Sequence, residues 1–257
     1  MILAIDAGNT NITMGVFDGE RLVGNFRMTT AIPRTSDEYG IVIRDIIEQN
    51  GISKKQIDDA ILASVVPAIN HSLISGIIKY FDIHPVIVKR TIETGITIAL
   101  DHPEQVGADR VVDAAAAFAL YGGPVIVIDY GTATTYDLVN AKGEFEAGVT
   151  APGIRISARA LWEDAAKLPE IEIKKPASIL AKETITSMQA GLVFGQIGQT
   201  EYLIRSLIDA SGYENVKVVA TGGLGKMISN ETELIQEYNP DLTLIGLNLI
   251  YQKQKRA

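Results

Sequence analysis

Two short runs of apolar residues, each ending in an aspartate, dominate the pattern of hydrophobic and polar positions. Residues 2–10 read ILAIDAGNT, and residues 125–133 read VIVIDYGTA. In both runs four apolar residues precede Asp, Gly follows two places later, and a hydroxyl-bearing residue stands close behind. Each run is too short for a helix and too rich in β-branched side chains to favour one, so we expect two buried strands.

The segments that follow these two strands also resemble each other. After the first, alternating apolar and polar residues flank Asp18-Gly19, a dipeptide typical of a β-hairpin. After the second, TTYDLVN and EFEAGVTA are separated by Ala141-Lys142-Gly143, which predicts a hairpin with a slightly longer turn. The chain therefore enters the same strand–turn–strand–turn–strand unit twice, about half a chain apart.

Helical patterns fill the rest of each half. After Ser36-Asp37, apolar residues recur at one helix face until Asn50-Gly51, which predicts an N-capped amphipathic helix. Further elements are expected as helices over residues 108–121, 187–210 and 244–255, and as strands over residues 60–66 and 216–220. Two halves of this kind indicate an α/β fold of two related domains that face a shared cleft. We expect an N-terminal domain of residues 1–122 and a C-terminal domain of residues 123–257.

The composition narrows the classes of partner. The net charge is −8 and the acidic residues are spread along the chain, so no basic surface for nucleic acid or a membrane is expected. Cysteine is absent, and the three histidines are too scattered to form a metal site. No apolar stretch approaches the ~18 residues of a membrane span, and the start lacks the basic region of a signal peptide. We therefore expect a soluble, cytoplasmic protein.

The turn Asp6-Ala7-Gly8-Asn9-Thr10-Asn11, which follows the first strand, has the residue types of a phosphate site. A glycine-containing turn can present several backbone N–H groups to a phosphate, while Thr10 and Asn11 add side-chain donors and Asp6 can hold a hydrated Mg²⁺. It is not a P-loop, because GxxxxGK[ST] is absent and the turn leads to another strand. The alternative is that Asp6 and Gly8 only shape a tight hairpin turn.

Two further turns offer related chemistry in the second half. The segment DYGTATT, from Asp129, provides threonine hydroxyls and a glycine for phosphate oxygens, with Asp129 placed to bind a cation. Its alternative is a threonine-rich strand of ordinary β-propensity. The segment ATGGLG, residues 220–225, has closely spaced glycines that let backbone approach a flat ring or a ribose. Because it follows two phosphate turns in chain order, it predicts the adenosine end of a nucleotide site.

Together the three turns resemble the phosphate-1, phosphate-2 and adenosine motifs of the acetate kinase, sugar kinase and actin superfamily. Within it the chain resembles type III pantothenate kinase, from residue 1 to about 250. The resemblance rests on DAGNTN at the N-terminus, RTSDEYG at 34–40, PEQVGADR at 103–110, DYGTATT at 129–135, APGI at 151–154 and ETITSMQAG at 183–191. It implies two actin-like (ribonuclease H-like) domains with a nucleotide cleft between them.

The resemblance also implies a reaction and a set of residues. ATP with Mg²⁺ would phosphorylate the primary hydroxyl of pantothenate to 4'-phosphopantothenate, the first step of coenzyme A biosynthesis, with Asp109 as the proton acceptor. The pantothenate site would comprise Leu100, Gly107, Ala108, Asp109, Arg110 and Thr184. The ATP contacts would comprise Asp6, Ala7, Gly8, Asn9, Thr10, Asn11, Ile12, Thr13, Thr132, Gly222 and Gly223.

Cations and a second copy of the chain belong to the same expectation. Asp129 matches the ligand of an activating monovalent cation, K⁺ or NH₄⁺, and Asp6 would hold Mg²⁺ through water. The family is homodimeric, and Thr184 would lie at the dimer interface, on or before a helix with apolar residues at Met188, Leu192, Val193 and Ile197. Leu100 stands roughly where many members have an aromatic residue that packs on pantothenate.

Two other functions fit parts of the sequence. A kinase of the same fold acting on another small alcohol or a sugar would share the nucleotide motifs and differ at Gly107–Arg110 and around Thr184. A non-catalytic nucleotide-binding regulator would need no base, and the presence of Asp109 argues against it. Asp109 itself could be only a carboxylate in the first turn of a helix, where the helix dipole favours a negative charge.

Overall fold

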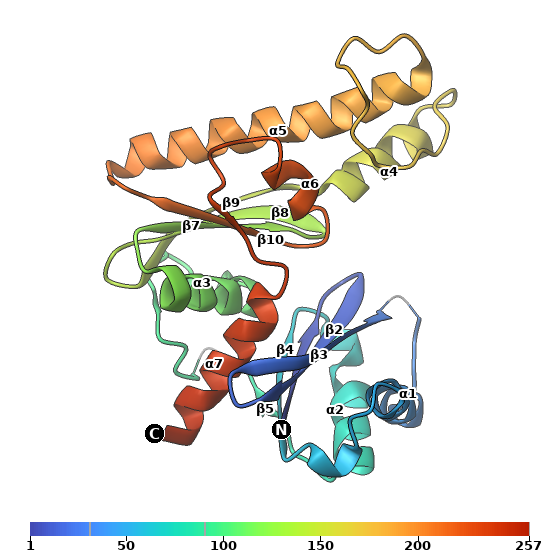
Figure 1. Ribbon diagram of the computed structural model, residues 1–257, viewed down its shortest axis with the longest axis vertical. Helices are drawn as coiled ribbons and strands as arrows, with labels where there is room; N and C mark the ends of the chain where they lie inside the picture. Colours follow the sequence, from blue (N-terminus) through green and yellow to red (C-terminus); the bar gives the residue numbers. More distant parts are fainter. Residues whose placement is uncertain (31, 90, 257) are drawn as a thin grey trace. The chain divides into compact units, whose positions relative to one another are not determined.

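The computed structural model describes residues 1–30, 32–89 and 91–256, which form two compact units (Figure 1). Unit 1 comprises Met1–Ile96, Asp101–Ala116 and Asp241–Ala257, and unit 2 comprises Thr97–Leu100 and Ala117–Pro240. The C-terminal helix is therefore grouped with the N-terminal sheet. The expected division into domains at residue 122 stays a prediction.

Unit 1 is built on a five-stranded sheet with the order β3-β2-β1-β4-β5, in which β1 is antiparallel to β2 and parallel to β4. Its strands are β1 (Ile2–Ala7), β2 (Asn11–Asp18), β3 (Arg21–Thr29), β4 (Asp59–Ser64) and β5 (Val86–Ile87). The predicted hairpin is confirmed, with Gly19 in the left-handed conformation (φ 63°) that the turn requires.

Helices cover both faces of this sheet. They are α1 (Ser36–Gln49), η1 (Lys54–Gln56), α2 (Pro67–Phe81), η2 (Pro103–Gln105), the first part of α3 (Ala108–Tyr121) and α7 (Leu242–Arg256). Side chains alternate along β1, so Leu3 and Ile5 enter a core shared with α1 and α2. Ile2 and Ala4 enter a second core, shared with α3 and α7. The strand carries polar chemistry only where it ends, at Asp6.

The N-cap of the first helix lies one residue earlier than expected. Thr35, not Ser36, is the N-cap, because its hydroxyl accepts a hydrogen bond from the Glu38 backbone N–H while the Glu38 carboxylate accepts one from the Thr35 backbone. This reciprocal pair is a capping box. Part of the RTSDEYG segment therefore stabilises a helix start.

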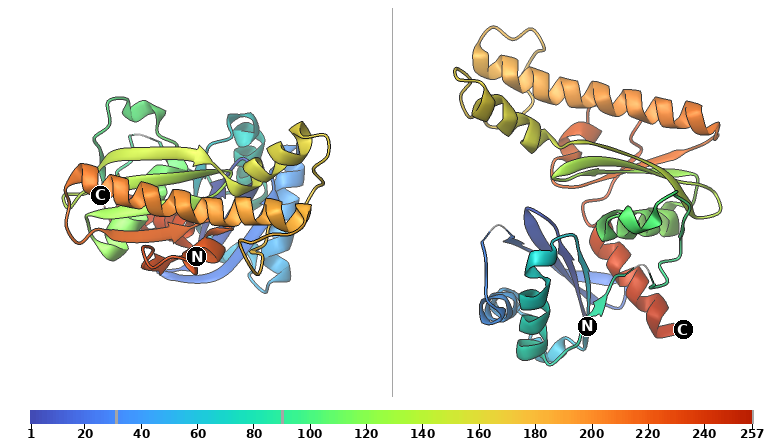
Figure 2. Two further views of the ribbon diagram at one scale, coloured as in Figure 1. Left: turned by 90° about the horizontal axis from the view of Figure 1, so that it is seen from above. Right: turned by 180° about the vertical axis from the view of Figure 1, so that it is seen from behind.

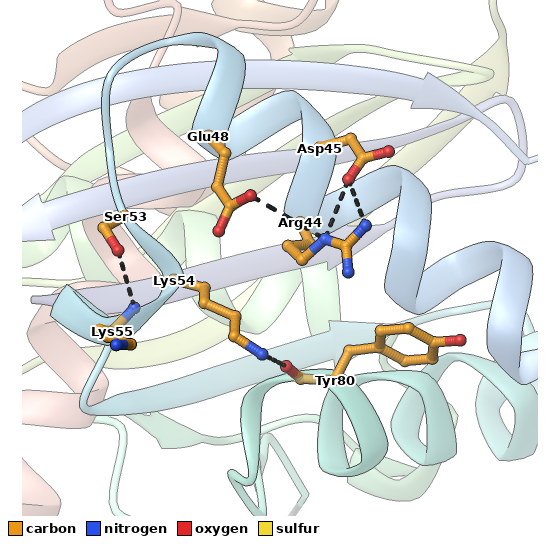
Figure 3. A network of polar contacts seen from close by, with 7 residues as sticks. All are labelled: Arg44, Asp45, Glu48, Ser53, Lys54, Lys55 and Tyr80. Atoms are coloured by element: carbon orange, nitrogen blue, oxygen red, sulfur yellow. Dashed lines mark hydrogen bonds and ion pairs between the residues drawn. The ribbon is translucent and has the colours of Figure 1, made fainter.

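Polar contacts link side chains along α1, and one of them joins the short helix η1 to the end of α2 (Figure 3). The Arg44 guanidinium donates two hydrogen bonds to the Asp45 carboxylate, of 2.9 and 2.7 Å, and lies within 4.0 Å of Glu48. The Lys54 ammonium donates to the Tyr80 carbonyl at 3.2 Å, in the last turn of α2. A cation at a helix C-terminus stabilises the unpaired carbonyls there.

Unit 2 contains a six-stranded sheet with the order β11-β10-β7-β8-β9-β6. Its strands are β6 (Thr97–Ile98), β7 (Val125–Tyr130), β8 (Ala133–Val139), β9 (Glu144–Pro152), β10 (Lys217–Thr221) and β11 (Glu237–Tyr238). Besides the end of α3, its helices are α4 (Ile154–Asp164), α5 (Thr184–Ser211) and α6 (Gly225–Ser229). Figure 2 shows α5 running along one face of this sheet.

The repeated unit predicted from the sequence is confirmed. In unit 1 the strands lie in the order β3-β2-β1-β4, and in unit 2 they lie in the order β9-β8-β7-β10. Both copies pair their first strand antiparallel with the second and parallel with a later strand. Asp6 and Asp129 therefore occupy equivalent places, near the carboxyl end of the central strand of each sheet.

Helices α2 and α4 were not predicted from the sequence. Pro67 at the start of α2 and apolar residues at Leu73, Ile77 and Phe81, each four apart, are the signals that could have found it. The predicted helix over 108–121 is confirmed at both ends, and α5 begins three residues before the expected position 187. None of the helices within the described residues is long and apolar enough to cross a membrane.

Candidate nucleotide and substrate site

The phosphate-1 turn joins β1 to β2 and comprises Gly8, Asn9 and Thr10. Its loop is closed by the Gly8 N–H, which donates to the Asn11 carbonyl at 3.0 Å. Thr30, at the end of β3, holds the loop from outside: its N–H donates to the Thr10 carbonyl at 3.0 Å and its hydroxyl to the Gly8 carbonyl at 2.7 Å. These bonds fix the shape of the turn. Sequence analysis did not single out Thr30, because its role depends on strand pairing.

The Gly107–Arg110 motif lies beside this turn in unit 1. The Val65 N–H, just after β4, donates to the Ala7 carbonyl at 3.1 Å. The Val65 side chain in turn lies 3.5 Å from the point where a Cβ of Gly107 would stand. The carboxyl ends of β1 and β4 thus carry both the phosphate-1 turn and the start of α3. In α/β sheets, ligands bind outside the carboxyl ends of the strands.

Asp109 occupies the first turn of α3 and is partly exposed. Its Oδ1 accepts a hydrogen bond of 2.8 Å from the Arg110 backbone N–H and packs against Gly107, where no Cβ could fit without movement. A carboxylate held this way is oriented by the backbone and partly accessible, as a proton acceptor must be. The same position also suits the helix-dipole alternative, so geometry by itself leaves both roles for Asp109 open.

In unit 2 the phosphate-2 and adenosine turns lie next to each other. Strand β10 is parallel to β7, with Thr221 opposite Asp129. The following residue, Gly222, has φ 87° and lies against the Asp129 carboxylate and the backbone of Tyr130. A side chain at Gly222 would collide with both, whereas Gly223 beside it opens onto free space. The adenosine turn therefore leaves the backbone at Gly223 uncovered, and its role in binding adenosine stays a prediction.

Gly153, in the APGI segment, closes the other side of the phosphate-2 turn. This turn consists of Gly131 and Thr132, with the Gly131 N–H donating to the Ala133 carbonyl at 3.1 Å. A Cβ at Gly153 would lie 2.6 Å from the Gly131 carbonyl oxygen and closer still to that of Thr132. Only glycine allows this approach, which explains physically why the segment between β9 and α4 carries a glycine there.

Thr184 and Leu100 belong to other segments of unit 2. Thr184 is the exposed first residue of α5 and borders a groove of about 500 Å³ between α4 and α5. The groove is lined by Ser157, Leu161, Leu168, Thr184, Ser187, Met188, Gly191 and Leu192. Leu100 follows β6 and is partly exposed, and the neighbouring Ala99 N–H donates to the Phe145 carbonyl at 2.8 Å.

The apolar residues that sequence analysis associated with the dimer helix face inwards. Met188, Leu192 and Val193 are buried in the core of unit 2, and Ile197 packs against the same core. They are not available to a partner, because α5 uses this face to cover its own sheet. The exposed face of α5 instead carries Thr184, Ile185, Gly191, Gly195, Gly198 and Tyr202.

Comparison with known proteins gives the family. Residues 2–206 match the family model described as type III pantothenate kinase. The chain is 64% identical over 256 residues to the type III pantothenate kinase of Agathobacter rectalis, covering 100% of this chain and 98% of that one. It is 46% identical over 253 residues to the type III pantothenate kinase of Bifidobacterium longum, covering 98% and 99% of the two chains.

Solved structures show the same fold at much lower identity. The ethanolamine utilization protein EutJ from Carboxydothermus hydrogenoformans has a TM-score of 0.56 and 15% identity, over 96% of this chain and 89% of that one. The predicted α/β, actin-like fold is thereby confirmed. The family model and the full-length relatives together show that the chain belongs to the type III pantothenate kinases.

Proposed function

We propose that this chain transfers the γ-phosphoryl group of ATP to the primary hydroxyl of pantothenate, the first step of coenzyme A biosynthesis, in the cytoplasm. The observation that carries the proposal is the junction in unit 1. There Val65 links the phosphate-1 turn, through the Ala7 carbonyl, to Gly107 at the start of the Gly107–Arg110 motif. A phosphate-binding turn and a carboxylate base at the same sheet edge are what phosphoryl transfer to an alcohol requires.

The ATP contacts are assigned to three turns. The segment from Asp6 to Thr13 and the residue Thr132 bind phosphate oxygens through backbone N–H groups and hydroxyls. Gly222 and Gly223 take the adenosine, because Gly222 can carry no side chain and Gly223 has open space above it. The rigidity that Thr30 and Gly153 give to the two phosphate turns means that the donors need no rearrangement when the nucleotide binds.

Asp109 is assigned the role of proton acceptor. Phosphoryl transfer depends mainly on positioning and charge neutralisation, and a carboxylate near the attacking hydroxyl takes up its proton as the bond to phosphorus forms. Arg110 carries a fixed positive charge that suits the carboxylate of pantothenate. Gly107 and Ala108, which precede Asp109, are assigned to the same pantothenate site, and Leu100 and Thr184 are assigned further pantothenate contacts.

The cations fit the oxygen donors of the two equivalent aspartates. Mg²⁺ binds carboxylate and water oxygens and bridges phosphates, so Asp6 would hold it through water and it would neutralise charge on the transferred group. K⁺ prefers carboxylate and carbonyl oxygens, which Asp129 and the Gly131–Thr132 turn provide. Within the described residues, no three His, Asp or Glu side chains form a metal-binding cluster.

A homodimer is also part of the proposal. Large apolar side chains remain exposed where α4, the following loop and α5 meet: Leu161, Ile179, Leu180 and Ile185 are 38, 66, 79 and 46% exposed. They surround Thr184, so a second copy seated there would cover them and border the same groove. An obligate interface of this kind usually buries about 2,000 Å² or more.

One assay separates this function from its alternatives. ADP release is measured with pantothenate, with a panel of sugars and other small alcohols, and with no acceptor. Of these conditions, we expect ADP release only when pantothenate is the acceptor. Release with a sugar alone would support a kinase of the same fold with another acceptor. Nucleotide binding without release under any condition would support a non-catalytic regulator.

A further inference from the structure

A buried chain of hydroxyl groups crosses from the sheet of unit 2 to α5. The Tyr130 hydroxyl and the Thr200 hydroxyl are 2.9 Å apart, and the Tyr136 hydroxyl is 3.0 Å from the same Thr200 oxygen. Gln196, one turn earlier on α5, donates its amide N–H to the Tyr136 hydroxyl at 3.1 Å. Thr200 and Tyr136 are fully buried, and Tyr130 and Gln196 nearly so. None of these residues is used by the reaction described above.

Through Tyr130, this row of buried hydroxyl groups reaches the adenosine turn. Tyr130 directly follows Asp129, and its backbone lies against Gly222. A Cβ on Gly225 would stand 3.2 Å from the Tyr130 ring and 2.7 Å from the Tyr238 ring, so Gly225 is held between the two. The Tyr238 hydroxyl donates to the Gly222 carbonyl at 3.0 Å. The turn thus contacts two tyrosines, Tyr130 and Tyr238, and Tyr130 is hydrogen-bonded to Thr200 of α5.

Because Tyr130 and Tyr136 are buried, their hydrogen bonds to Thr200 fix the orientation of the two rings. Burial raises the pKa of both Tyr130 and Tyr136 above its ordinary value, which favours the neutral hydroxyl form of both side chains. A buried hydroxyl without a partner is costly, so each ring is confined to the orientation that keeps its hydroxyl on Thr200. An apolar pair of similar size would fill the space without fixing the ring.

We infer that Tyr130 and Thr200 are positioning residues for ATP: they hold the ring that sets where the adenosine turn, residues 220–225, presents its backbone. The inference rests on the proposed role of this turn in binding adenosine. Neither residue needs to contact ATP. Loss of the Thr200 hydroxyl should let the Tyr130 ring and the turn move, which weakens ATP binding and leaves the pantothenate contacts in place.

The test compares matched variants of the full chain. Thr200→Val keeps the shape of the side chain and removes the hydroxyl, Thr200→Ser keeps the hydroxyl, and Tyr130→Phe removes the other end of the bond. Tyr213→Phe is the control, since its hydroxyl donates to the Glu146 carboxylate at 2.6 Å, in another part of unit 2, and not to Thr200. The KM for ATP, the KM for pantothenate, kcat and Tm are measured for each.

We expect Thr200→Val and Tyr130→Phe to raise the KM for ATP by about three- to tenfold, with the KM for pantothenate within about twofold. Thr200→Ser should lie closer to the parent, and Tyr213→Phe should leave both KM values unchanged. If Thr200→Val and Tyr130→Phe lower only Tm, the network is merely structural and the inference is wrong. Should Thr200→Val not fold, Tyr130→Phe decides by the same criteria.

A further variant separates this inference from the assignment on which it rests. Gly223→Val places a side chain where an added Cβ would meet no atom within 4 Å, so we expect it to raise the KM for ATP while the fold is kept. If Gly223→Val raises it and the Thr200 and Tyr130 variants do not, only the positioning role fails. If Gly223→Val has no effect, the turn does not bind adenosine and both assignments are overturned.

Discussion

The two copies of the repeated unit differ most at the residue after the aspartate. In unit 1 this residue is Ala7, a small side chain that disappears into the core with α1 and α2. In unit 2 it is Tyr130, whose hydroxyl reaches Thr200 on α5. The strand orders match, yet the turn after β1 is held by Thr30, which follows β3, whereas the end of β7 is joined to helix α5 through Tyr130. Equivalent positions in a repeat can therefore be stabilised by unrelated contacts.

A second difference lies in the parallel neighbour of each central strand. The chain leaves β4 through Val65, which packs near Gly107 and so joins the first turn to the acceptor motif. It leaves β10 through Gly222, which packs on Asp129 and so joins the second turn to the adenosine motif. The parallel strand beside the central strand thus has a different role in each copy. In unit 1 the residue after it contacts the acceptor motif, and in unit 2 the residue after it belongs to the adenosine motif.

The largest effect is expected at the acceptor end. Asp109→Asn keeps the size of the side chain and removes its charge and basicity, so kcat should fall by at least about a hundredfold. Asp101→Asn, an exposed carboxylate in the same unit, is the control and should leave kcat unchanged. The Tm of Asp109→Asn should stay near that of the parent. Turnover within a few-fold of the parent would leave Asp109 as a helix-stabilising carboxylate only.

At the adenosine turn, substitution of two neighbouring glycines by alanine should have different effects on Tm. Gly222→Ala forces a side chain into a left-handed backbone position and against Asp129, which costs about 1–3 kcal/mol and lowers Tm by several degrees. Displacement of the turn should also raise the KM for ATP by roughly tenfold. Gly223→Ala meets open space and should keep its Tm. Equal Tm losses in the two variants would contradict the described geometry.

The phosphate-2 copy should also show the cation effect. At matched ionic strength, turnover should be higher in potassium or ammonium than in sodium, because the Asp129 oxygen donors suit the larger ions. Asp129→Asn should remove most of this preference. Asp6→Asn, the same change in the other copy, should lower activity in all three salts without changing their order. Identical rates of the parent in the three salts would rule out the cation role.

A smaller effect is expected where α7 is fastened to the sheet of unit 1. Asp59 accepts hydrogen bonds from the Tyr251 hydroxyl at 2.8 Å and the Lys255 ammonium at 3.0 Å. Burial by itself would raise the pKa of Asp59, but these two bonds, the hydrogen bond from the Ala60 backbone N–H and the charge of Lys255 together lower the pKa below its ordinary value. The stabilisation is therefore present above about pH 4 and is lost as the pH falls through the folded-state pKa.

Asp59→Asn tests this attachment by urea unfolding at several pH values. At pH 7 we expect a loss of about 0.5–1 kcal/mol, because Lys255 is largely exposed and its ion pair is weakened by solvent. The difference from the parent should shrink below about pH 4, where the parent carboxylate also becomes protonated. A difference that stays constant down to that range would mean that packing, and not the charge of Asp59, is responsible.

The sequence predicts the repeated strands well and the details of their support poorly. The two Asp-x-Gly runs and the helix over 108–121 could be read from local pattern, since each is stabilised by its own residues. The family resemblance added roles for Asp109 and Asp129 that pattern alone leaves ambiguous. Thr30, Val65 and Thr200 could not be assigned in this way. Each of them acts on a residue at least 20 positions away, so its role depends on the folded chain.

The central claim is that Asp109 in unit 1 serves the acceptor and that the turn at Gly223 in unit 2 binds adenosine. It is tested most directly by equilibrium binding of ATP to Asp109→Asn, Gly223→Val and the parent. Asp109 stands at the acceptor end, so its variant should bind ATP with the parent's affinity although its turnover is lost. Gly223→Val should bind ATP at least about tenfold more weakly, because its side chain occupies the space assigned to adenosine. An equal loss of ATP affinity in both variants, or none in Gly223→Val, would contradict the account.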